Sequence, residues 1–482
     1  MPSRQTLPPP CLRLFRWLRM LLSALVLSTL AAQPVAAQSI LRDAETEAVL
    51  REMTKPLVIA AGLDPRNVEI IVVHDPEINA FVAGGQVVFV NSGLITAADN
   101  ANQVQGVVAH ELGHMAGGHV LQGGKAVTKA YGIMLLSMVA EILAASAAGG
   151  TNRTCYGCGG YDVGGANGNG VTGGDTYDPG TLSYFAFSRT QEATADAAGV
   201  KFLDAAHISG KGSIAFFKKL QSLESRYRVT NTTQDSFNRD HPLTDERIAY
   251  LSDQYPRSSA WGNKTDAALE MKFQRVKAKL AGFVNDPTET LRDYPLSDQS
   301  LPAHYARAYA YHRGAYPEKA LEEVNALIAA QPHDPYFLEL EGQILLESGK
   351  AKAALAPLRE AVALTEAQPL ITATFGHALV ETEDPANYPE ALRVLRAAVA
   401  RDDENPDAWY SLGVIYDRTG DVAHAALCTA ETAQLEQRWA VALRNAQIAS
   451  SGLPTGSADA LRSEDIILEA KNAIEKQKKH KH

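Results

Sequence analysis

The sequence predicts a mainly α-helical protein of the α+β class, in which a helical domain with a small β-sheet precedes an α-solenoid. Three observations predict this fold. Short stretches rich in valine and isoleucine, at 68–73 and 87–90, are typical of strands. The stretch from Val107 to His119 has apolar residues at helical spacing. From about residue 295 the chain is alanine-rich and repeats with a period of 34 residues, which is typical of stacked helix pairs.

Residues 1–37 have the pattern of a cleaved secretory signal. They contain four arginines and no acidic residue, followed by an apolar run from Met20 to Ala32 and by V-A-A before Gln38. A retained membrane anchor is the alternative, but the apolar run is short for a span of about 20 residues. Cys11 precedes the apolar run, so we expect no lipid anchor.

Charge and cysteine content narrow the possible partners. Without residues 1–37 the chain has 41 Lys and Arg against 55 Asp and Glu, a formal charge of -14, so nucleic acid is an unexpected partner. Cys155 and Cys158 form an isolated C-x-x-C with no second pair for a zinc ribbon, and we expect a small local disulfide. The total of 482 residues suffices for about three domains.

The first domain, expected at 38–290, begins with a helix over 43–62. Strands are predicted at Val68 to Val73 and at Val87 to Val90, and Gly84-Gly85 marks a tight connection from Phe81-Val82 into the second of them. A strand of this kind can pair with an extended peptide backbone. A purely structural hairpin is the alternative.

The central motif is V-V-A-H-E-L-G-H-M-A-G-G-H, from Val107 to His119. His110 and His114 are four residues apart on one helix face, so their imidazoles can bind one zinc ion. Glu111 points aside from both and can act as the general base toward water, as a hydrolytic zinc site requires. The alternative is two histidines that share this spacing by chance on a core helix.

A catalytic zinc needs a third protein ligand. The metzincin position, ten residues after His110, is Val120, and His119 falls one residue early, so that class is rejected. The helix-compatible run from Ser188 to Ala197 places Glu192 and Asp196 on one face. Glu192 is the predicted third ligand, and Asp196 the predicted hydrogen-bond partner of a ligating imidazole. An acidic pair on an exposed helix is the alternative.

Two segments between these motifs have unusual composition. Residues 130–148 are mostly apolar but contain Glu141, which makes them a poor membrane span and favours a buried or membrane-facing helix, so peripheral membrane contact is a possible function. In residues 149–180, 12 of 32 positions are glycine, which predicts a mobile loop or lid, with plain disorder as the alternative.

Further along, a helix is expected from Phe202 to Ser225, and the chain then reaches His241-Pro242. Proline restricts the residue before it to an extended backbone, so the His241 ring can project from a turn. His241 is a candidate fourth ligand that would close the metal site and hold the enzyme in an off state, or a hydrogen-bond donor to the oxyanion of the reaction. A solvated turn is the alternative.

Four ordered motifs together resemble the gluzincin metallopeptidase family of the HtpX, Ste and Oma type proteases. They are I-N-A-F-V-A-G-G-Q-V-V-F-V-N-S-G-L-I at 78–95, H-E-L-G-H at 110–114, R-T-Q-E-A-T-A-D at 189–196 and H-P-L-T-D-E-R-I at 241–248. The resemblance implies a zincin-type fold with one Zn²⁺ per chain. It also implies that Arg247 is an active-site arginine, which could stabilise the oxyanion; a surface arginine is the alternative.

The second domain, expected at 295–445, is a set of about four tetratricopeptide repeats. Small residues recur at Ala308, Gly342, Gly376 and Gly413, and a second register of alanines confirms the period at Ala320, Ala354, Ala391 and Ala425. Stacked helix pairs of this type present a concave face for a partner. Residues 446–482 are expected to form a C-terminal helix and a frayed tail.

The signal, the protease motifs and the repeats together are most similar to the periplasmic BepA-type layout. This implies a periplasmic zinc metalloendopeptidase with chaperone-like quality control of outer-membrane β-barrel proteins. Unfolded or stalled outer-membrane proteins, and the β-barrel assembly machinery bound through the repeats, are the implied partners. The alternatives are a non-proteolytic chaperone or scaffold and an integral membrane protease.

Overall fold

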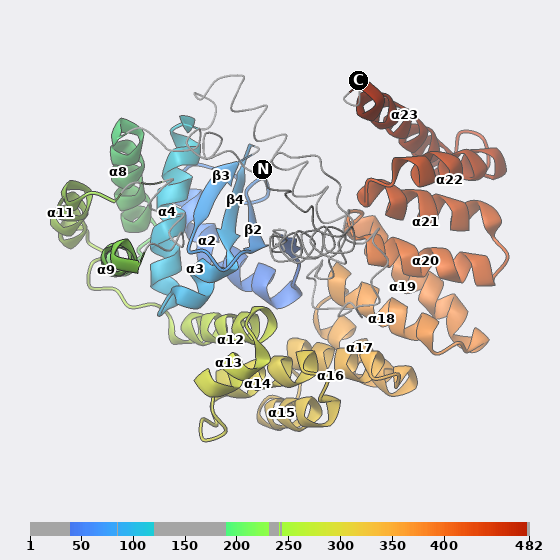
Figure 1. Cartoon of the computed structure of the whole chain (residues 1–482), viewed down its shortest axis with the longest axis horizontal. Helices are drawn as coiled ribbons and strands as arrows, with labels where there is room; N and C mark the ends of the chain where they lie inside the picture. The colour runs from blue at the N-terminus through green and yellow to red at the C-terminus, as the bar shows by residue number, and fades with distance from the viewer. Residues whose placement is uncertain (1–38, 84, 120–188, 231–240, 242, 480–482) are drawn as a thin grey trace, which may run out of the picture.

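The computed structural model describes residues 39–83, 85–119, 189–230, 241 and 243–479. The predictions for the signal at 1–37, the apolar helix at 130–148, the glycine-rich segment at 149–180 and the disulfide between Cys155 and Cys158 lie outside this range. Figure 1 shows a first unit of helices around a small sheet, from which the remaining helices follow one another in an arc. The mainly helical α+β class is therefore confirmed.

The sheet has four strands in the order β1-β2-β4-β3. Strand β2 runs parallel to β4, whereas β1 and β3 pair antiparallel with their neighbours at the two edges. The two predicted strands correspond to β2 and β4, and Phe81-Val82 lies in β3. The bounds are β1 Ser39–Leu41, β2 Glu69–His74, β3 Ala80–Ala83 and β4 Val87–Asn91.

Helix α4, Ala101–Ala116, is the core of the first unit. The Asn100 side chain caps it by accepting a hydrogen bond from the Gln103 backbone N–H at 3.1 Å. Almost every residue from Ala101 to His114 is buried, because α4 packs against strand β3 and against helices α2, α8 and α9. The bounds of the helices around it are α2 Ala44–Ala60, α3 Ser92–Ala97, α8 Arg189–Ala205, α9 Lys211–Thr230, α11 Asp245–Gln254, α12 Ala267–Val284 and α13 Pro287–Asp293.

The expected continuous helix from Phe202 to Ser225 is wrong. Helix α8 ends at Ala205, and α9 begins only at Lys211. His207 adopts a positive φ of 56°, which ends the helical path. Gly210 lies against the Tyr255 ring, where an added Cβ would come within 2.0 Å of a ring carbon. The break therefore comes from a tight turn that only a small residue allows.

The repeats form helix pairs, as predicted. The repeat glycines lie where paired helices touch: a Cβ on Gly342 would meet the Leu358 side chain at 2.4 Å, and one on Gly376 would meet Leu395 at 2.5 Å. The helices are α14 Leu301–Arg313, α15 Pro317–Ala330, α16 Pro335–Glu347, α17 Ala351–Leu364, α18 Pro369–Glu381, α19 Tyr388–Arg401, α20 Pro406–Arg418, α21 Val422–Leu435, α22 Trp439–Gly452 and α23 Ala458–Lys479.

The first unit and the first repeats share one hydrophobic core, which extends from Leu41 in β1 to Ile344 in α16. A second core begins at Leu346 and fills the later repeats up to Cys428, which is buried there. Among the helices of the described residues, none is both long enough and apolar enough to cross a membrane.

Candidate metal centre

Two helices bring the predicted ligands together because small residues let them approach closely. A Cβ on Gly113 of α4 would come within 2.6 Å of the Ala195 carbonyl oxygen of α8, and one on Gly199 would lie 3.4 Å from the Ala109 carbonyl oxygen. At this crossing, the face of α4 with His110 and His114 meets the face of α8 with Glu192.

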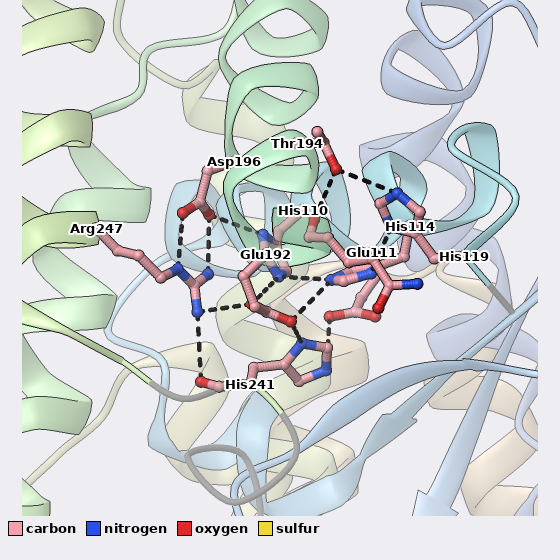
Figure 2. Close-up of polar contacts among 10 residues, drawn as sticks. His110, Glu111, His114, His119, Glu192, Thr194, Asp196, His241 and Arg247 are labelled. Atoms are coloured by element: carbon pink, nitrogen blue, oxygen red, sulfur yellow. Dashed lines mark hydrogen bonds and ion pairs between the residues drawn. The ribbon is translucent and has the colours of Figure 1, made fainter. Parts of the chain in front are cut away.

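The three side chains meet at one buried point. His110 Nε2 and His114 Nε2 are 3.1 Å apart, and each lies 3.3 Å from one oxygen of Glu192. Figure 2 shows the two imidazoles and the carboxylate converging. With His241, they form a cluster of four buried side chains whose ligand atoms lie within 4.8 Å of one another.

This donor set fits a metal ion. In a tetrahedral site with bonds of about 2.0 to 2.2 Å, neighbouring ligand atoms lie roughly 3.3 to 3.6 Å apart. The distances between the imidazole nitrogens and the Glu192 oxygens are close to that spacing. Two nitrogens and one carboxylate oxygen are also the donor types that zinc favours in catalytic sites.

Asp196 and Arg247 hold the ligands from one side. Asp196 Oδ1 lies 2.9 Å from His110 Nδ1, the ring nitrogen that faces away from the cluster. The Arg247 guanidinium donates two hydrogen bonds to Asp196, at 2.7 and 2.9 Å, and its Nη1 lies 2.6 Å from Glu192 Oε2. Asp196 is thus placed where a partner of a ligating imidazole was expected.

Arg247 is the third residue of helix α11, and Thr244 caps that helix by accepting the Arg247 backbone N–H at 3.3 Å. The guanidinium also donates to the His241 carbonyl oxygen at 3.4 Å. Arg247 is therefore anchored to the carboxylates of α8 and to the turn before α11. The oxyanion role expected for it stays a prediction.

Glu111 and His241 complete the cluster. Both side chains are fully buried, and His241 Nε2 lies 3.5 Å from Glu111 Oε1. His241 Nδ1 lies 3.1 Å from Glu192 Oε1. Neither oxygen of Glu111 accepts a hydrogen bond from the described residues, so its carboxylate has acceptor capacity for a molecule bound at the centre.

Burial and neighbouring charges shift the pKa values of these histidines and glutamates, often in opposite directions. Burial lowers the pKa of His114 to about 3 and raises that of Glu111 above its ordinary value. Burial also lowers the pKa of His110, but its hydrogen bonds to Asp196 and Glu192 outweigh this effect and raise it to about 9. Burial opposes ionisation of Glu192 as well, yet its hydrogen bonds to the histidines keep its pKa well below the usual range. The centre therefore combines an ionised Glu192 with a Glu111 that retains a proton more readily.

Gly113 and Phe217 are among the residues of this centre that sequence reasoning missed. Gly113 permits the close crossing of α4 and α8, and its position inside H-E-L-G-H was the only signal. The Phe217 ring of α9 lies edge-on to the His110 ring, with centroids 6.0 Å apart, and 5.8 Å from the Arg247 guanidinium. Phe217 could not be found, because no motif surrounds it.

Comparison with known proteins agrees with this geometry. Residues 44–254 match the model of peptidase family M48, and residues 305–369 and 382–438 match that of the tetratricopeptide repeat. A beta-barrel assembly-enhancing protease from Yersinia pestis is 23% identical over 415 residues, which cover 85% of this chain and 80% of that protein. Its counterpart in Escherichia coli (strain K12) is 24% identical and aligns over 70% of this chain and 65% of its own length. Metalloprotease LoiP from Escherichia coli (strain K12) is 29% identical over 49% of this chain and 81% of its own length.

The fold, the buried histidine and glutamate cluster and these similarities define a metallopeptidase. More narrowly, residues 44–254 are similar to peptidase family M48, and the residues that follow are similar to tetratricopeptide repeats.

Proposed function

We propose that the protein is a zinc-dependent endopeptidase in which His110, His114 and Glu192 hold one zinc ion. The observation that carries this proposal is the buried site in which the two imidazole nitrogens lie 3.1 Å apart and each lies 3.3 Å from a Glu192 oxygen. A zinc ion there would polarise the substrate carbonyl and make water a stronger nucleophile. Asp196 orients His110, and Arg247 balances the negative charge of Asp196 and Glu192.

Glu111 is the general base of the proposed reaction. It accepts a proton from the attacking water and then transfers it to the nitrogen of the leaving amine. Its burial suits this task, because the raised pKa brings the carboxyl closer to neutral pH, where a group can both accept and release a proton. Arg247 lends positive charge to the centre while the oxyanion forms, and its contact with the Glu192 carboxylate keeps it near the reacting atoms.

Strand β3 is the proposed binding edge for the substrate backbone. It is an edge strand of the sheet and packs beside helix α4, which carries the general base. An extended peptide that pairs with β3 would be held by backbone hydrogen bonds, independent of its side chains. This mode suits a protease that acts on unfolded chains of varied sequence.

His241 is the proposed regulatory element of the same site. Its ring lies within 3.5 Å of both the base and the third ligand, so a neutral imidazole there can occupy the fourth position at the metal. The enzyme would then rest in an off state until the turn at His241 moves away. The competing role, a hydrogen-bond donor to the oxyanion, predicts the opposite effect of its removal.

The biological setting of this proposal is the bacterial periplasm, where the protease would act on stalled outer-membrane β-barrel proteins. Relatives named beta-barrel assembly-enhancing proteases, similar along both the peptidase domain and the repeats, support this setting. The repeats would bind unfolded outer-membrane proteins or the β-barrel assembly machinery, since stacked tetratricopeptide helices commonly bind other proteins. A chaperone-like function would use the same docking face without cleavage.

The test is a comparison of Glu111→Gln with the two ligand variants His110→Ala and Glu192→Ala. Glu111→Gln should keep about one zinc per chain and lose casein hydrolysis, because it removes the base and not a ligand. The ligand variants should lose both zinc and hydrolysis. Zinc content is measured by atomic emission after dialysis. Zinc content and casein cleavage of each variant are compared with those of the unchanged protein. Full activity of Glu111→Gln would exclude the mechanism, and zinc without any hydrolysis in the unchanged protein would favour a scaffold with a structural metal.

A further inference from the structure

His119 lies beyond the helix that carries the zinc motif, yet its ring returns to that motif. Helix α4 ends at Ala116, and Gly118 adopts a left-handed φ of 62°, which turns the chain back on itself. The His119 side chain is 7% exposed, and its Nδ1 lies 3.0 Å from Nδ1 of His114. Figure 2 shows the two rings side by side, with Thr194 of α8 beyond them.

A glycine makes room for this ring. A Cβ on Gly117 would lie 2.6 Å from His119 Nε2 and 2.9 Å from its Cε1. The Gly117 backbone, at φ -73° and ψ -7°, is ordinary for any residue. Gly117 is therefore required for the space that it leaves to the imidazole, and not for its conformational freedom.

The hydrogen bonds around His119 favour one arrangement of its protons. The Thr194 hydroxyl is placed to donate its single proton to the Gln191 carbonyl oxygen at 2.9 Å. In that arrangement the Thr194 oxygen, 3.1 Å from His119 Nε2, accepts a hydrogen bond, and we assign the His119 proton to Nε2. His119 Nδ1 is then an acceptor, and the proton between the two rings belongs to Nδ1 of His114.

This chain of bonds determines which nitrogen of His114 is available to a metal. With its proton on Nδ1, His114 presents the lone pair of Nε2 to the point where His110 and Glu192 converge. The two ligating histidines therefore differ, because His110 is oriented by the carboxylate of Asp196 and His114 by a neutral imidazole. Ligating histidines are more commonly oriented by carboxylates, backbone carbonyls or water.

We propose that His119 is a positioning residue for the metal centre, which accepts the Nδ1 proton of His114 and so fixes the tautomer and ring orientation of that ligand. This inference deepens the proposed function and rests on the zinc site described there. His119 is not one of the four clustered candidate ligands and acts through His114. Thr194 fixes the proton on its far side, and Gly117 holds the space for its ring.

The test compares His119→Asn with His119→Leu, which have nearly the same shape. Asn can place its side-chain oxygen near the former Nδ1 and accept the His114 proton, whereas Leu cannot. Zinc affinity is measured on the full chain by competition with a chromophoric chelator. We expect His119→Leu to raise the dissociation constant for zinc by about 10- to 100-fold and His119→Asn to recover most of that loss. With zinc in excess, KM for casein should stay unchanged in both variants.

A second variant covers the case in which His119→Leu does not fold. Gly117→Ala leaves both histidines in the chain but moves the His119 ring, so it should also weaken zinc binding. His333→Leu, at an exposed histidine in the repeats, is the control and should bind zinc as the unchanged protein does. The proposal is overturned if the Asn and Leu variants bind zinc equally well, or if Gly117→Ala binds it normally. If the unchanged protein binds no zinc, the proposed function itself fails. If the unchanged protein binds zinc and the variants bind it equally well, only the role of His119 fails.

Discussion

At the scale of single residues, His241 provides the sharpest experiment on regulation. Its imidazole is buried between Glu111 and Glu192, so its removal must affect the centre directly. If His241 blocks the fourth position, His241→Ala should raise basal casein cleavage, with self-cleavage, at unchanged zinc content. If it donates to the oxyanion, the same change should reduce turnover by about a hundredfold or more.

We expect the increase, because the ring already lies among the ligand atoms in this structure. The control is His333→Ala, which removes an exposed imidazole in the repeats and should change neither quantity. An inactive but zinc-loaded His241→Ala protein would exclude the blocking role. Loss of zinc together with activity would instead make His241 a structural ligand.

Part of this centre could be predicted because the chemistry lies in the local sequence. The spacing of His110 and His114 fixes their common face on a helix, and Glu192 and Asp196 follow by the same rule on a second helix. The contact between His119 and His114 was not foreseen, because it depends on the turn at Gly118. A ring that reaches back across a helix end has no signature in spacing alone.

At the scale of secondary structure elements, the crossing of α4 and α8 sets the metal site. Gly113→Ala would place a Cβ 2.6 Å from the Ala195 carbonyl oxygen, and a backbone atom cannot move aside as a side chain can. We expect the helices to separate, with a loss of about 1 to 3 kcal/mol in the free energy of unfolding and weaker zinc binding. Urea denaturation and the chelator competition measure the two effects.

The matched control for this prediction is Gly262→Ala. A Cβ at Gly262 meets no atom within 4 Å, so this variant should change the free energy of unfolding by less than about 0.5 kcal/mol. Equal stability of the two variants would show that the crossing tolerates a wider separation. Zinc binding that is unchanged in Gly113→Ala would show that the ligands adjust to it.

Elements with a strong period were predictable, and breaks between them were not. The helices of the repeats follow from small residues at a fixed interval, since Gly342 and Gly376 each meet a leucine of the paired helix. The interruption between α8 and α9 was missed, although Ser209, Gly210 and Gly212 in that stretch are signals for a turn. It arises from packing of Gly210 against Tyr255, which lies 45 residues further along the chain.

At the scale of the whole molecule, a buried network of charges joins the peptidase unit to the repeats. Arg275 of α12 pairs with Glu45 of α2 at 2.8 Å and with Asp334, the cap of α16, at 2.7 Å. The Glu45 carboxylate also accepts a hydrogen bond from Tyr305 of α14 at 2.7 Å. Charges that are buried and paired in this way are costly to separate, so the two units should unfold together.

Glu339 of α16 should make the stability of this junction depend on pH. Neither of its buried oxygens accepts a hydrogen bond from the described residues, and burial raises its pKa to about 8, against 4.5 for an exposed glutamate. Lys279 of α12 lowers that pKa, whereas Asp43 and Glu45 at the start of α2 raise it. Because the folded state binds the proton more tightly, stability falls as pH rises between about 4.5 and 8.

Glu339→Gln should remove this dependence. The free energy of unfolding of the variant, relative to that of the unchanged protein, should rise by on the order of 1 kcal/mol per pH unit between pH 5 and 8. Urea denaturation at several pH values measures this difference. Glu360→Gln, at an exposed glutamate in the repeats, serves as the control and should show no such gain. Parallel stability curves for the unchanged protein and Glu339→Gln would mean that Glu339 is ionised in the fold.

The same junction indicates where the chain can be shortened and still fold. The sequence predicts a domain boundary near residue 290, between the first domain and the repeats. The first hydrophobic core continues beyond this position to Phe337 and Ile344. A chain that ends at residue 290 would expose that core and leave Arg275 without Asp334. A chain that ends at residue 366, after α17, keeps the first hydrophobic core and the ion pairs of Arg275. It loses the later repeats, including the ion pair of Asp402 with Arg42 and the packing of Leu370 near Ala44.

We therefore expect the chain ending at 366 to fold, to bind zinc and to cleave casein in a manner that Glu111→Gln abolishes. The chain ending at 290 should be unfolded or aggregated, because it loses apolar burial and a paired charge together. Circular dichroism, zinc content and casein cleavage of the two chains, measured beside the full chain, decide between these outcomes. A soluble and fully active chain ending at 290 would show that the peptidase unit does not depend on the repeats for its stability, and the shared core would then be a docking surface between two independent domains.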